Sequence, residues 1–403
     1  MTEGSTTVRQ ATMDLLRDLG MTTVFGNPGS TELPFLDRWP NDFRYVLGLQ
    51  ESSVVGMADG YARATGRAAF CNLHSAVGIG HALGNVFTAF RNQAPLVITA
   101  GQQARGLLPL NPFLGATDAA AFPRPYVKWS CEPARAEDVP AALAHAHQVA
   151  MQSPRGPTFV SIPSDDWAVP TRPFPARQVS RDMAPDPVAL DALAAALYGS
   201  RNPVLVIGPE VDAEAAGPAA VVLAERLRAP VWASPFASRV CFPEDHLLFA
   251  GFLAAAPGAV SAALAPHDLV LVLGAPVFTF HVAGDFTLAR GRCELFHLTT
   301  DGEAVAAAPF GTGILGSLRL GLPALTGRLA STNRVAPPPR PRLPPPEASH
   351  PIGAEHLFHA LSKALPNSAI VVEEAPSHRP AMQARLPMRE WGSFFTMTSG
   401  GLG

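Results

Sequence analysis

The sequence has few charged residues for its length. Of its 403 residues, 16% are charged and 47% are hydrophobic, and the formal net charge is −3. Soluble domains usually carry about 25% charged residues, so we expect contacts between domains or subunits to cover part of the surface. The near-neutral balance argues against a nucleic-acid partner, because proteins that bind nucleic acid present a basic surface.

Cysteines are also few, and they are widely spaced. Cys71, Cys131, Cys241 and Cys293 lie 60, 110 and 52 residues apart, which excludes a Cys-x-x-Cys pair, a zinc knuckle and a dense disulfide framework. No apolar run approaches the ~18 residues of a membrane-spanning helix, and the N-terminus lacks the pattern of a signal peptide. We therefore expect a cytoplasmic protein with no membrane partner.

The signatures of several common enzyme classes are missing. The sequence contains no Ser-x-x-Lys, Gly-x-Ser-x-Gly, His-Glu-x-x-His or Walker motif, and no calcium-loop spacing. Gly78, Gly80 and Gly84 resemble a dinucleotide loop, but the third glycine comes one residue late and no acidic ribose partner is evident. Close packing of a helix on a sheet explains these glycines better.

Proline, in contrast, is abundant, and it marks the organisation of the chain. Residues 336–346 contain seven of the 41 prolines and predict an extended spacer without a core. Elsewhere short apolar runs alternate with helical patterns, which predicts an α/β protein whose successive parallel sheets carry helices on both faces. We place the domains at 1–175, 185–335 and 350–403, with a linker at 336–349. The last domain is too short for a comparable core, so we expect it to be truncated.

The spacing of apolar residues predicts individual helices and strands. In the first domain we expect helices over 7–19, 52–64 and 79–90 and strands over 22–25, 45–49, 68–73, 95–100 and 159–162. In the second we expect strands over 204–207, 231–233, 269–273 and 295–298, with alanine-rich helices between them. In the third we expect a helix over 353–364 and a strand over 369–373.

Glu51 is the most informative carboxylate. It lies where a predicted strand gives way to a helix, and its neighbours Val54 and Val55 are apolar. Its position alone favours a carboxylate that stabilises the N-terminus of the helix. Alternatively, desolvation keeps this carboxyl protonated, so that it can donate a proton to a ring nitrogen of a ligand.

Two other candidate residues follow predicted strands of the first domain. His74 comes directly after the strand at 68–73, where ligands collect in open α/β sheets, although a structural histidine is equally compatible with this position. Ser30 follows the tight turn at 26–29. A serine after a turn is usually a helix cap, but in a cleft it could hydrogen-bond a substrate carboxylate.

His281 is the corresponding candidate of the second domain. It follows the strand at 269–273 in a loop that also carries Phe278 and Phe280. These three side chains either line an apolar pocket or seal a seam between domains. Taken alone, the residue spacing therefore predicts only a cytoplasmic multidomain α/β protein with a plausible cleft.

Eight short segments, in one order along the chain, carry a resemblance to a known family. They are residues 23–36, 42–46, 50–62, 72–76, 99–103, 123–129, 208–212 and 274–278. Together they resemble the thiamine-diphosphate-dependent decarboxylases, and Ser30, His74 and His281 resemble the benzoylformate decarboxylase branch. The likeness runs through essentially the whole chain.

The resemblance implies the fold and the assembly of that family. Three successive α/β domains would hold the pyrimidine of thiamine diphosphate, act as a spacer, and bind the diphosphate through Mg²⁺, respectively. The active site would form between the first domain of one subunit and the last domain of another. The implied partner is therefore a second copy of the chain, in a dimer or tetramer, which would explain the low charge.

The resemblance also implies a reaction. An aromatic 2-oxo acid, benzoylformate, would lose CO₂ through a carbanion and enamine on the cofactor to give benzaldehyde. Glu51 would donate a hydrogen bond to the pyrimidine, Ser30 would hold the substrate carboxylate, and His74 and His281 would move protons. Two different readings stay open: a related decarboxylase or carboligase for another bulky 2-oxo acid, and a non-catalytic interaction protein with the same fold.

Further cofactor contacts follow from the same resemblance. They are Asn27, Pro28, Gly29, Ser377, Gly401 and Leu402. The metal motif of the family would lie beyond Gly403, so we expect no metal ligand in this sequence and no activity from this chain alone. Pro376 and His378 depart from the hydroxyl-rich stretch of the family, and their role stays open.

Overall fold

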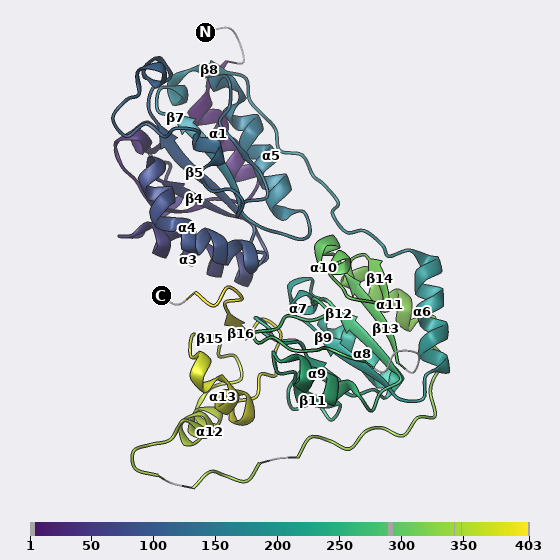
Figure 1. The fold of residues 1–403 in the computed structure, drawn as a ribbon. Coiled ribbons are helices and arrows are strands. Elements are labelled where there is room, and N and C mark those ends of the chain that lie inside the picture. Colours follow the sequence, from purple (N-terminus) through teal and green to yellow (C-terminus); the bar gives the residue numbers. More distant parts are fainter. Residues whose placement is uncertain (1–4, 289–292, 342, 348, 402–403) are drawn as a thin grey trace. The chain divides into compact units, whose positions relative to one another are not determined.

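The chain forms two compact units in the computed structural model. The structure describes residues 5–288, 293–341, 343–347 and 349–401. Unit 1 comprises Met1–Arg181 with Ser399–Gly403, and unit 2 comprises Asp182–Thr398 (Figure 1). In the described residues, no helix is both long and apolar enough to span a bilayer.

Unit 1 is built on a six-stranded sheet. Its strands are β2 (Thr23–Asn27), β3 (Arg44–Leu47), β4 (Ala69–Leu73), β5 (Leu96–Gln102), β6 (Ser130–Cys131) and β7 (Thr158–Pro163). Its α-helices are α1 (Val8–Asp18), α2 (Leu33–Leu36), α3 (Glu51–Thr65), α4 (Ser75–Arg91) and α5 (Val139–Met151). All neighbouring strands are parallel, in the order β3-β2-β4-β5-β7-β6. A short antiparallel pair, β1 (Thr6–Thr7) with β8 (Pro170–Thr171), lies outside this sheet.

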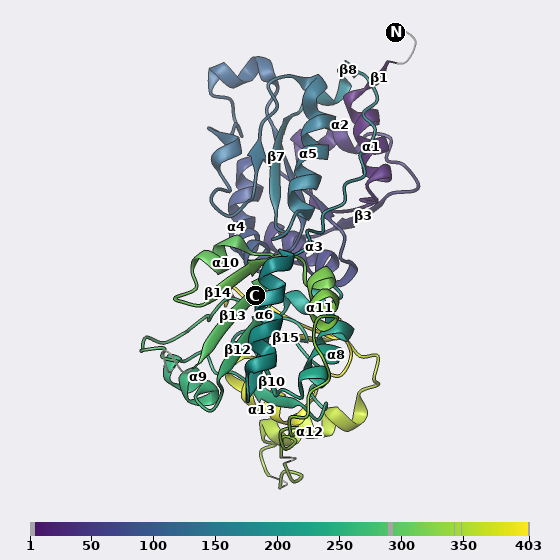
Figure 2. The same cartoon turned by 90° about the vertical axis from the view of Figure 1, so that its right-hand side faces the viewer.

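Side chains along the strands of unit 1 alternate between two helical layers. Val24 on β2 and Phe70 on β4 pack with α1 and α5, whereas the next residues, Phe25 and Cys71, pack with α3 and α4. Figures 1 and 2 show these two helix pairs on opposite faces of the sheet. Strands buried on both faces read as continuous apolar runs, as parallel sheets require, and the predicted α/β arrangement is confirmed.

Unit 2 repeats this plan with a second parallel sheet. Its strands are β9 (Pro203–Ile207), β10 (Val231–Ala233), β11 (Phe249–Phe252), β12 (Leu269–Leu273), β13 (Glu294–Thr299) and β14 (Thr312–Leu315). The order is β11-β10-β9-β12-β13-β14. One face packs against α6 (Pro187–Gly199), α8 (Gly217–Leu227) and α11 (Leu318–Thr326), and the other against α9 (Pro257–Leu264).

A smaller piece of unit 2 follows the proline-rich segment. It contains α12 (Ala354–Ala364), β15 (Val371–Glu373), α13 (Arg379–Arg385) and β16 (Phe394–Thr396). Val240, which lies between β10 and β11, packs with Met382 and Phe394 in one buried hydrophobic cluster. This piece therefore packs within unit 2. The described residues between Thr326 and Ala354 form no helix or strand. The division of the chain into three domains stays a prediction.

The predicted elements occur in the structure, with shifted ends and several omissions. The helix predicted over 79–90 begins at Ser75 instead. The elements that were not predicted are the strands β1, β6, β8, β11, β14 and β16 and the helices α2, α5 and α13. The two residues of β6 are too few to show a periodicity, and Gly251 and Gly313 interrupt the apolar patterns of β11 and β14.

Close packing does not explain the glycine pattern in α4. A Cβ atom at Gly78 would lie 3.5 Å from Cβ of Leu73 on β4, an ordinary van der Waals distance, and none of the surrounding atoms lies within 4 Å of such an atom at Gly84. The contact between helix and sheet therefore does not require glycine at either position.

His147 on α5 makes the stability of unit 1 depend on pH. Burial lowers the pKa of this histidine to about 4, and the charge of Arg181 acts in the same direction. An unfolded histidine titrates near pH 6.5, so the unfolded chain binds more protons than the folded chain between these values. The free energy of unfolding therefore falls as the pH falls from about 6.5 to about 4, by up to about 3 kcal/mol.

The variant His147→Phe should remove this contribution. Urea unfolding of unit 1 at pH 7 and pH 4.5 should show a smaller loss of stability in the variant than in the unchanged protein. His145→Gln, on an exposed position of the same helix, is the matched control and should lose stability as the unchanged protein does. An equal loss in all three proteins would contradict the prediction.

Candidate active site

The predicted residues of unit 1 gather at one edge of its sheet. Asn27, at the end of β2, pairs with Leu73, at the end of β4, and Leu73 pairs with Ala100 on β5. The chain continues from β2 toward β3 on one side, whereas β4 leads to β5 on the other. Open parallel sheets bind ligands at the carboxyl ends of strands where the strand order reverses in this way.

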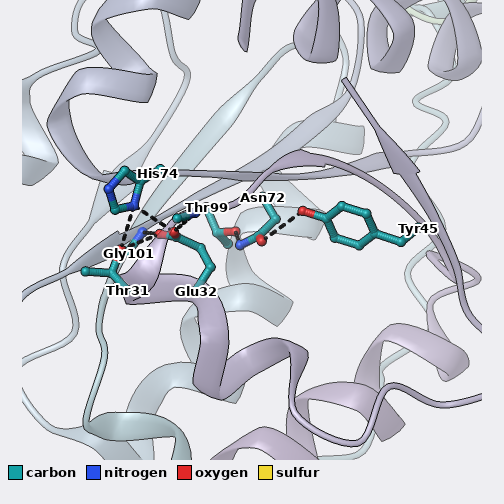
Figure 3. Close-up of polar contacts among 8 residues, drawn as sticks. Thr31, Glu32, Tyr45, Asn72, His74, Thr99 and Gly101 are labelled. Atoms are coloured by element: carbon teal, nitrogen blue, oxygen red, sulfur yellow. Dashed lines mark hydrogen bonds and ion pairs between the residues drawn. The ribbon is translucent and has the colours of Figure 1, made fainter. Parts of the chain in front are cut away.

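Glu32, a residue that the sequence analysis did not single out, lies at the centre of this edge. It is 1% exposed and belongs to a short 3₁₀ turn, Ser30–Glu32. Its Oε2 accepts hydrogen bonds from the Gly29 N–H and from His74 Nδ1, both at 2.8 Å. Its Oε1 accepts from Thr31 Oγ1 at 2.7 Å and from the Gly101 N–H at 2.8 Å (Figure 3). Four donors thus offset the cost of burying this carboxylate.

The same network orients the imidazole of His74. Because the Thr31 hydroxyl donates its one proton to Glu32, it acts as an acceptor toward His74 Nδ1, 3.1 Å away. Glu32 also accepts at Nδ1, so we assign the ring proton to this nitrogen. The other nitrogen, Nε2, is left for a ligand, and the His74 side chain is 21% exposed.

Two glycines make room for this arrangement. A Cβ atom at Gly29 would lie 2.3 Å from His74 Nδ1, and one at Gly101 would lie 2.2 Å from Glu32 Oε1. Any side chain at either position would displace the histidine or the carboxylate. Gly29, predicted as a cofactor contact, therefore has a demonstrable packing role beside His74.

A buried polar chain lies behind Glu32. Tyr45 Oη donates to Asn72 Oδ1 at 3.4 Å, and Asn72 Nδ2 donates to Thr99 Oγ1 at 3.3 Å (Figure 3). Burial, reinforced by the charge of Glu32, raises the pKa of Tyr45 well above its ordinary value. The phenol therefore stays neutral, as a hydrogen-bond donor requires.

Glu51 lies on the neighbouring helix pair. It begins α3 and is 8% exposed, and its Oε2 lies 3.2 Å from Nδ1 of His81 on α4. A Cβ atom at Gly78 would lie only 3.4 Å from Glu51 Cγ and Oε1. Because the Gly78 N–H donates to the His74 carbonyl, Glu51 packs on the helical turn that His74 precedes.

The remaining predicted residues of unit 1 occupy less constrained positions. Ser30 is exposed, and Gly29 rather than Ser30 precedes the first turn, so Ser30 is not its N-cap. Asn27 and Pro28 are half-buried at the end of β2, and Gly401 is exposed. Leu402 lies outside the described residues.

The candidates of unit 2 lie on loops. His281 is exposed, and its backbone N–H donates to the Ala255 carbonyl at 2.8 Å. Phe278 is 8% exposed and packs in the core of unit 2, with its ring centroid 5.4 Å from that of Phe286. Ser377 is exposed in the short turn Pro376–His378.

The described residues offer no evident metal centre. No group of three or more His, Cys, Asp or Glu side chains in that part of the chain is placed to hold a metal ion.

Two family models match the chain. Residues 6–122 match the N-terminal thiamine-pyrophosphate-binding domain of thiamine pyrophosphate enzymes, and residues 190–325 match their central domain. These matches cover more than half of the chain. The chain belongs to the thiamine pyrophosphate enzymes.

Known members of this family resemble the chain over nearly its whole length. Benzoylformate decarboxylase of Pseudomonas aeruginosa is 47% identical over 98% of this chain and 76% of the relative. The structure of benzoylformate decarboxylase from Polynucleobacter necessarius matches with a TM-score of 0.94 and 40% identity, over 98% of this chain and 75% of that one. The 4-hydroxybenzoylformate decarboxylase of Rhodococcus jostii RHA1 matches with a TM-score of 0.94 and 41% identity, over 98% and 76%.

The residues of unit 1 fit the cofactor of this thiamine pyrophosphate enzyme. Glu51 is a nearly buried carboxyl whose described hydrogen-bonding partner is His81 alone, on one oxygen, so the other oxygen can serve a heterocycle. Glu32, in contrast, already accepts four hydrogen bonds and has no such capacity.

The variant Glu32→Gln tests the network around His74. An amide keeps only one acceptor oxygen, so two of the four donors lose their acceptor. We expect the free energy of unfolding of unit 1 to fall by about 1–3 kcal/mol, and the ¹⁵N resonances of His74 to show less proton on Nδ1. Glu137→Gln, an exposed carboxylate of the same unit, should change neither measurement. An unchanged Nδ1 resonance in Glu32→Gln would refute the assigned role of Glu32.

Proposed function

We propose that this thiamine pyrophosphate enzyme decarboxylates an aromatic 2-oxo acid and converts benzoylformate to benzaldehyde and CO₂. The observation that carries the proposal is the 47% identity to a benzoylformate decarboxylase over 98% of the chain. The polar edge of unit 1 supports it, because a histidine with one free ring nitrogen and a nearly buried carboxyl lie beside the same helix turn.

Glu51 is the residue that we propose to meet the cofactor pyrimidine. The Glu51 side chain is nearly buried, and a carboxyl that carries a proton can donate a hydrogen bond to a ring nitrogen. The bound cofactor supplies the electron sink for the pair that the leaving carboxylate releases. Asn27, the last residue of β2, and Pro28 and Gly29, which follow it, would contact the cofactor through their backbone.

His74 is proposed to move a proton at Nε2. Its Nδ1 donates to Glu32, so the network holds the ring in one orientation and one tautomer. Imidazole suits both giving and taking a proton near neutral pH. His281 would be the second histidine of the proton transfers, and Ser30 would donate its hydroxyl proton in a hydrogen bond to the substrate carboxylate.

The diphosphate end of the cofactor involves further residues. We propose that Ser377, Gly401 and Leu402 contact the cofactor, and that Mg²⁺ accompanies the diphosphate. The described residues place no cluster of ligands for this metal, so none of the steps above is assigned to it. We also propose a homo-oligomer, a dimer or tetramer, whose active site combines two subunits, and a cytoplasmic location.

A hydroxylated substrate is the second candidate. The match to a 4-hydroxybenzoylformate decarboxylase, at 41% identity, is as extensive as the match to a benzoylformate decarboxylase structure. A carboligase for another bulky 2-oxo acid and a non-catalytic protein of the same fold are the two weaker candidates. Rates with benzoylformate, 4-hydroxybenzoylformate and a branched aliphatic 2-oxo acid separate these substrates, and absence of cofactor binding by the complete protein would favour the non-catalytic candidate.

The variant Glu51→Gln tests the proposed function. The amide keeps the size of the side chain but loses the acid, so the rate of benzaldehyde formation by the complete protein should fall about 100-fold or more. Glu303→Gln, an exposed carboxylate in the first turn of Gly302–Ala306, should keep the full rate. An unchanged rate in Glu51→Gln would refute the proposed role of Glu51.

The 403-residue chain by itself should form no benzaldehyde from benzoylformate. This chain spans 76% of the length of the benzoylformate decarboxylase of Pseudomonas aeruginosa, and the resemblance implies that the metal motif of the family lies outside the part that it spans. The assay compares this chain with the complete protein at equal concentration, with thiamine diphosphate and Mg²⁺ present. Turnover by the 403-residue chain alone would show that the anchor lies within it.

A further inference from the structure

His81 contacts the carboxyl that the proposed function depends on. Its Nδ1 lies 3.2 Å from Glu51 Oε2, although the two residues are 30 positions apart in the sequence. Glu51 is the first residue of α3, and His81 lies in the second turn of α4. His81 is not predictable as a functional residue from the sequence, because an isolated histidine on a helix carries no motif.

Two hydrogen bonds to backbone carbonyl oxygens hold α3 and α4 together beside the contact between His81 and Glu51. Ser52, which follows Glu51, donates its hydroxyl proton to the carbonyl oxygen of His81 itself. Asn85, one turn after His81, donates its amide to the carbonyl oxygen of Ser52. The two helices are therefore joined at the residue pair in question, and the imidazole approaches Glu51 from a fixed position.

The geometry differentiates the two oxygens of Glu51. Oε2 faces His81, whereas Oε1 lies near Gly78, which has no side chain to cover it. The Glu51 side chain is 11% exposed and the His81 side chain 59% exposed. A hydrogen bond at Oε2 occupies that oxygen and leaves Oε1 to bind a ligand.

We propose that His81 is a positioning residue for Glu51. The imidazole of His81 donates its Nδ1 proton to Oε2 of Glu51 and thereby directs the carboxyl proton of Glu51 to Oε1. The inference rests on the proposed function, in which Glu51 donates a hydrogen bond to the pyrimidine. A carboxyl has one proton, and a donor at Oε2 disfavours the form in which that oxygen carries it. His81 also restricts the rotation of the Glu51 side chain before the cofactor arrives, which lowers the ordering cost of binding.

Three substitutions at position 81 separate this role from a merely structural one. Asn carries its amide nitrogen at the same bond distance from the backbone as Nδ1, Gln carries it one bond further out, and Leu carries no donor. We expect His81→Leu to weaken the binding of thiamine diphosphate, with Mg²⁺, by about tenfold, the usual effect of losing a hydrogen bond to a charged or acidic group. His81→Asn should restore binding to within about threefold, whereas His81→Gln should not.

The binding measurement is titration calorimetry on the complete protein. Thermal unfolding of each variant without cofactor shows whether the fold is retained. Binding by His81→Leu at the affinity of the unchanged protein would overturn the proposal, and so would equal restoration by Asn and Gln.

A second measurement needs no cofactor. The ¹⁵N resonance of His81 Nδ1 in the unchanged protein should be that of a protonated nitrogen, and Glu51→Gln should shift it. A resonance typical of an unprotonated Nδ1 would overturn the proposal, because the proton would then belong to Glu51.

Glu51→Gln also distinguishes this inference from the proposed function. If Glu51→Gln abolishes decarboxylation while His81→Leu binds thiamine diphosphate normally, the proposed function stands and the role of His81 is wrong. If Glu51→Gln forms benzaldehyde at the full rate, the proposed function itself fails, whatever His81 does.

Discussion

The edge of the sheet in unit 1 is organised by the desolvation of one carboxylate. Glu32 is 1% exposed, and a charged group at such a depth is tolerated only when hydrogen bonds replace its water. Its donors come from the ends of three strands: Gly29 after β2, His74 after β4 and Gly101 on β5. The hydrogen bonds that Glu32 requires therefore fix the conformation of the loops around the imidazole of His74.

The two buried carboxylates of this region have different environments and so different capacities. Glu32 accepts four hydrogen bonds, and its role is to orient His74. Glu51 has one described partner, His81, and the absence of a side chain at Gly78 leaves space beside its other oxygen. Environment rather than residue type thus distinguishes the two glutamates, and it underlies our proposal that Glu51 meets a ligand; such divisions are known from other carboxylate pairs in enzymes.

Much of the fold was predictable because parallel strands buried on both faces are apolar along their whole length. The apolar runs at β2, β4 and β5 and the helical spacing of α1 and α3 located these elements within a few residues. Ser30, Glu51 and His74 were predicted as candidates because each follows a predicted strand, whereas Asn27, Pro28 and Gly29 were predicted from the family resemblance alone. The two-residue strand β6 had too few residues to show a period.

The sequence by itself determined the α/β class, the approximate positions of most strands and the resemblance to a family, because these depend on local pattern and on segments in order. Only the tertiary structure decided which side chains meet at the sheet edge. Glu32 lies 42 positions before His74, and His81 lies 30 positions after Glu51. Those pairs depend on strand register and helix crossing, which bring together residues that no local pattern connects.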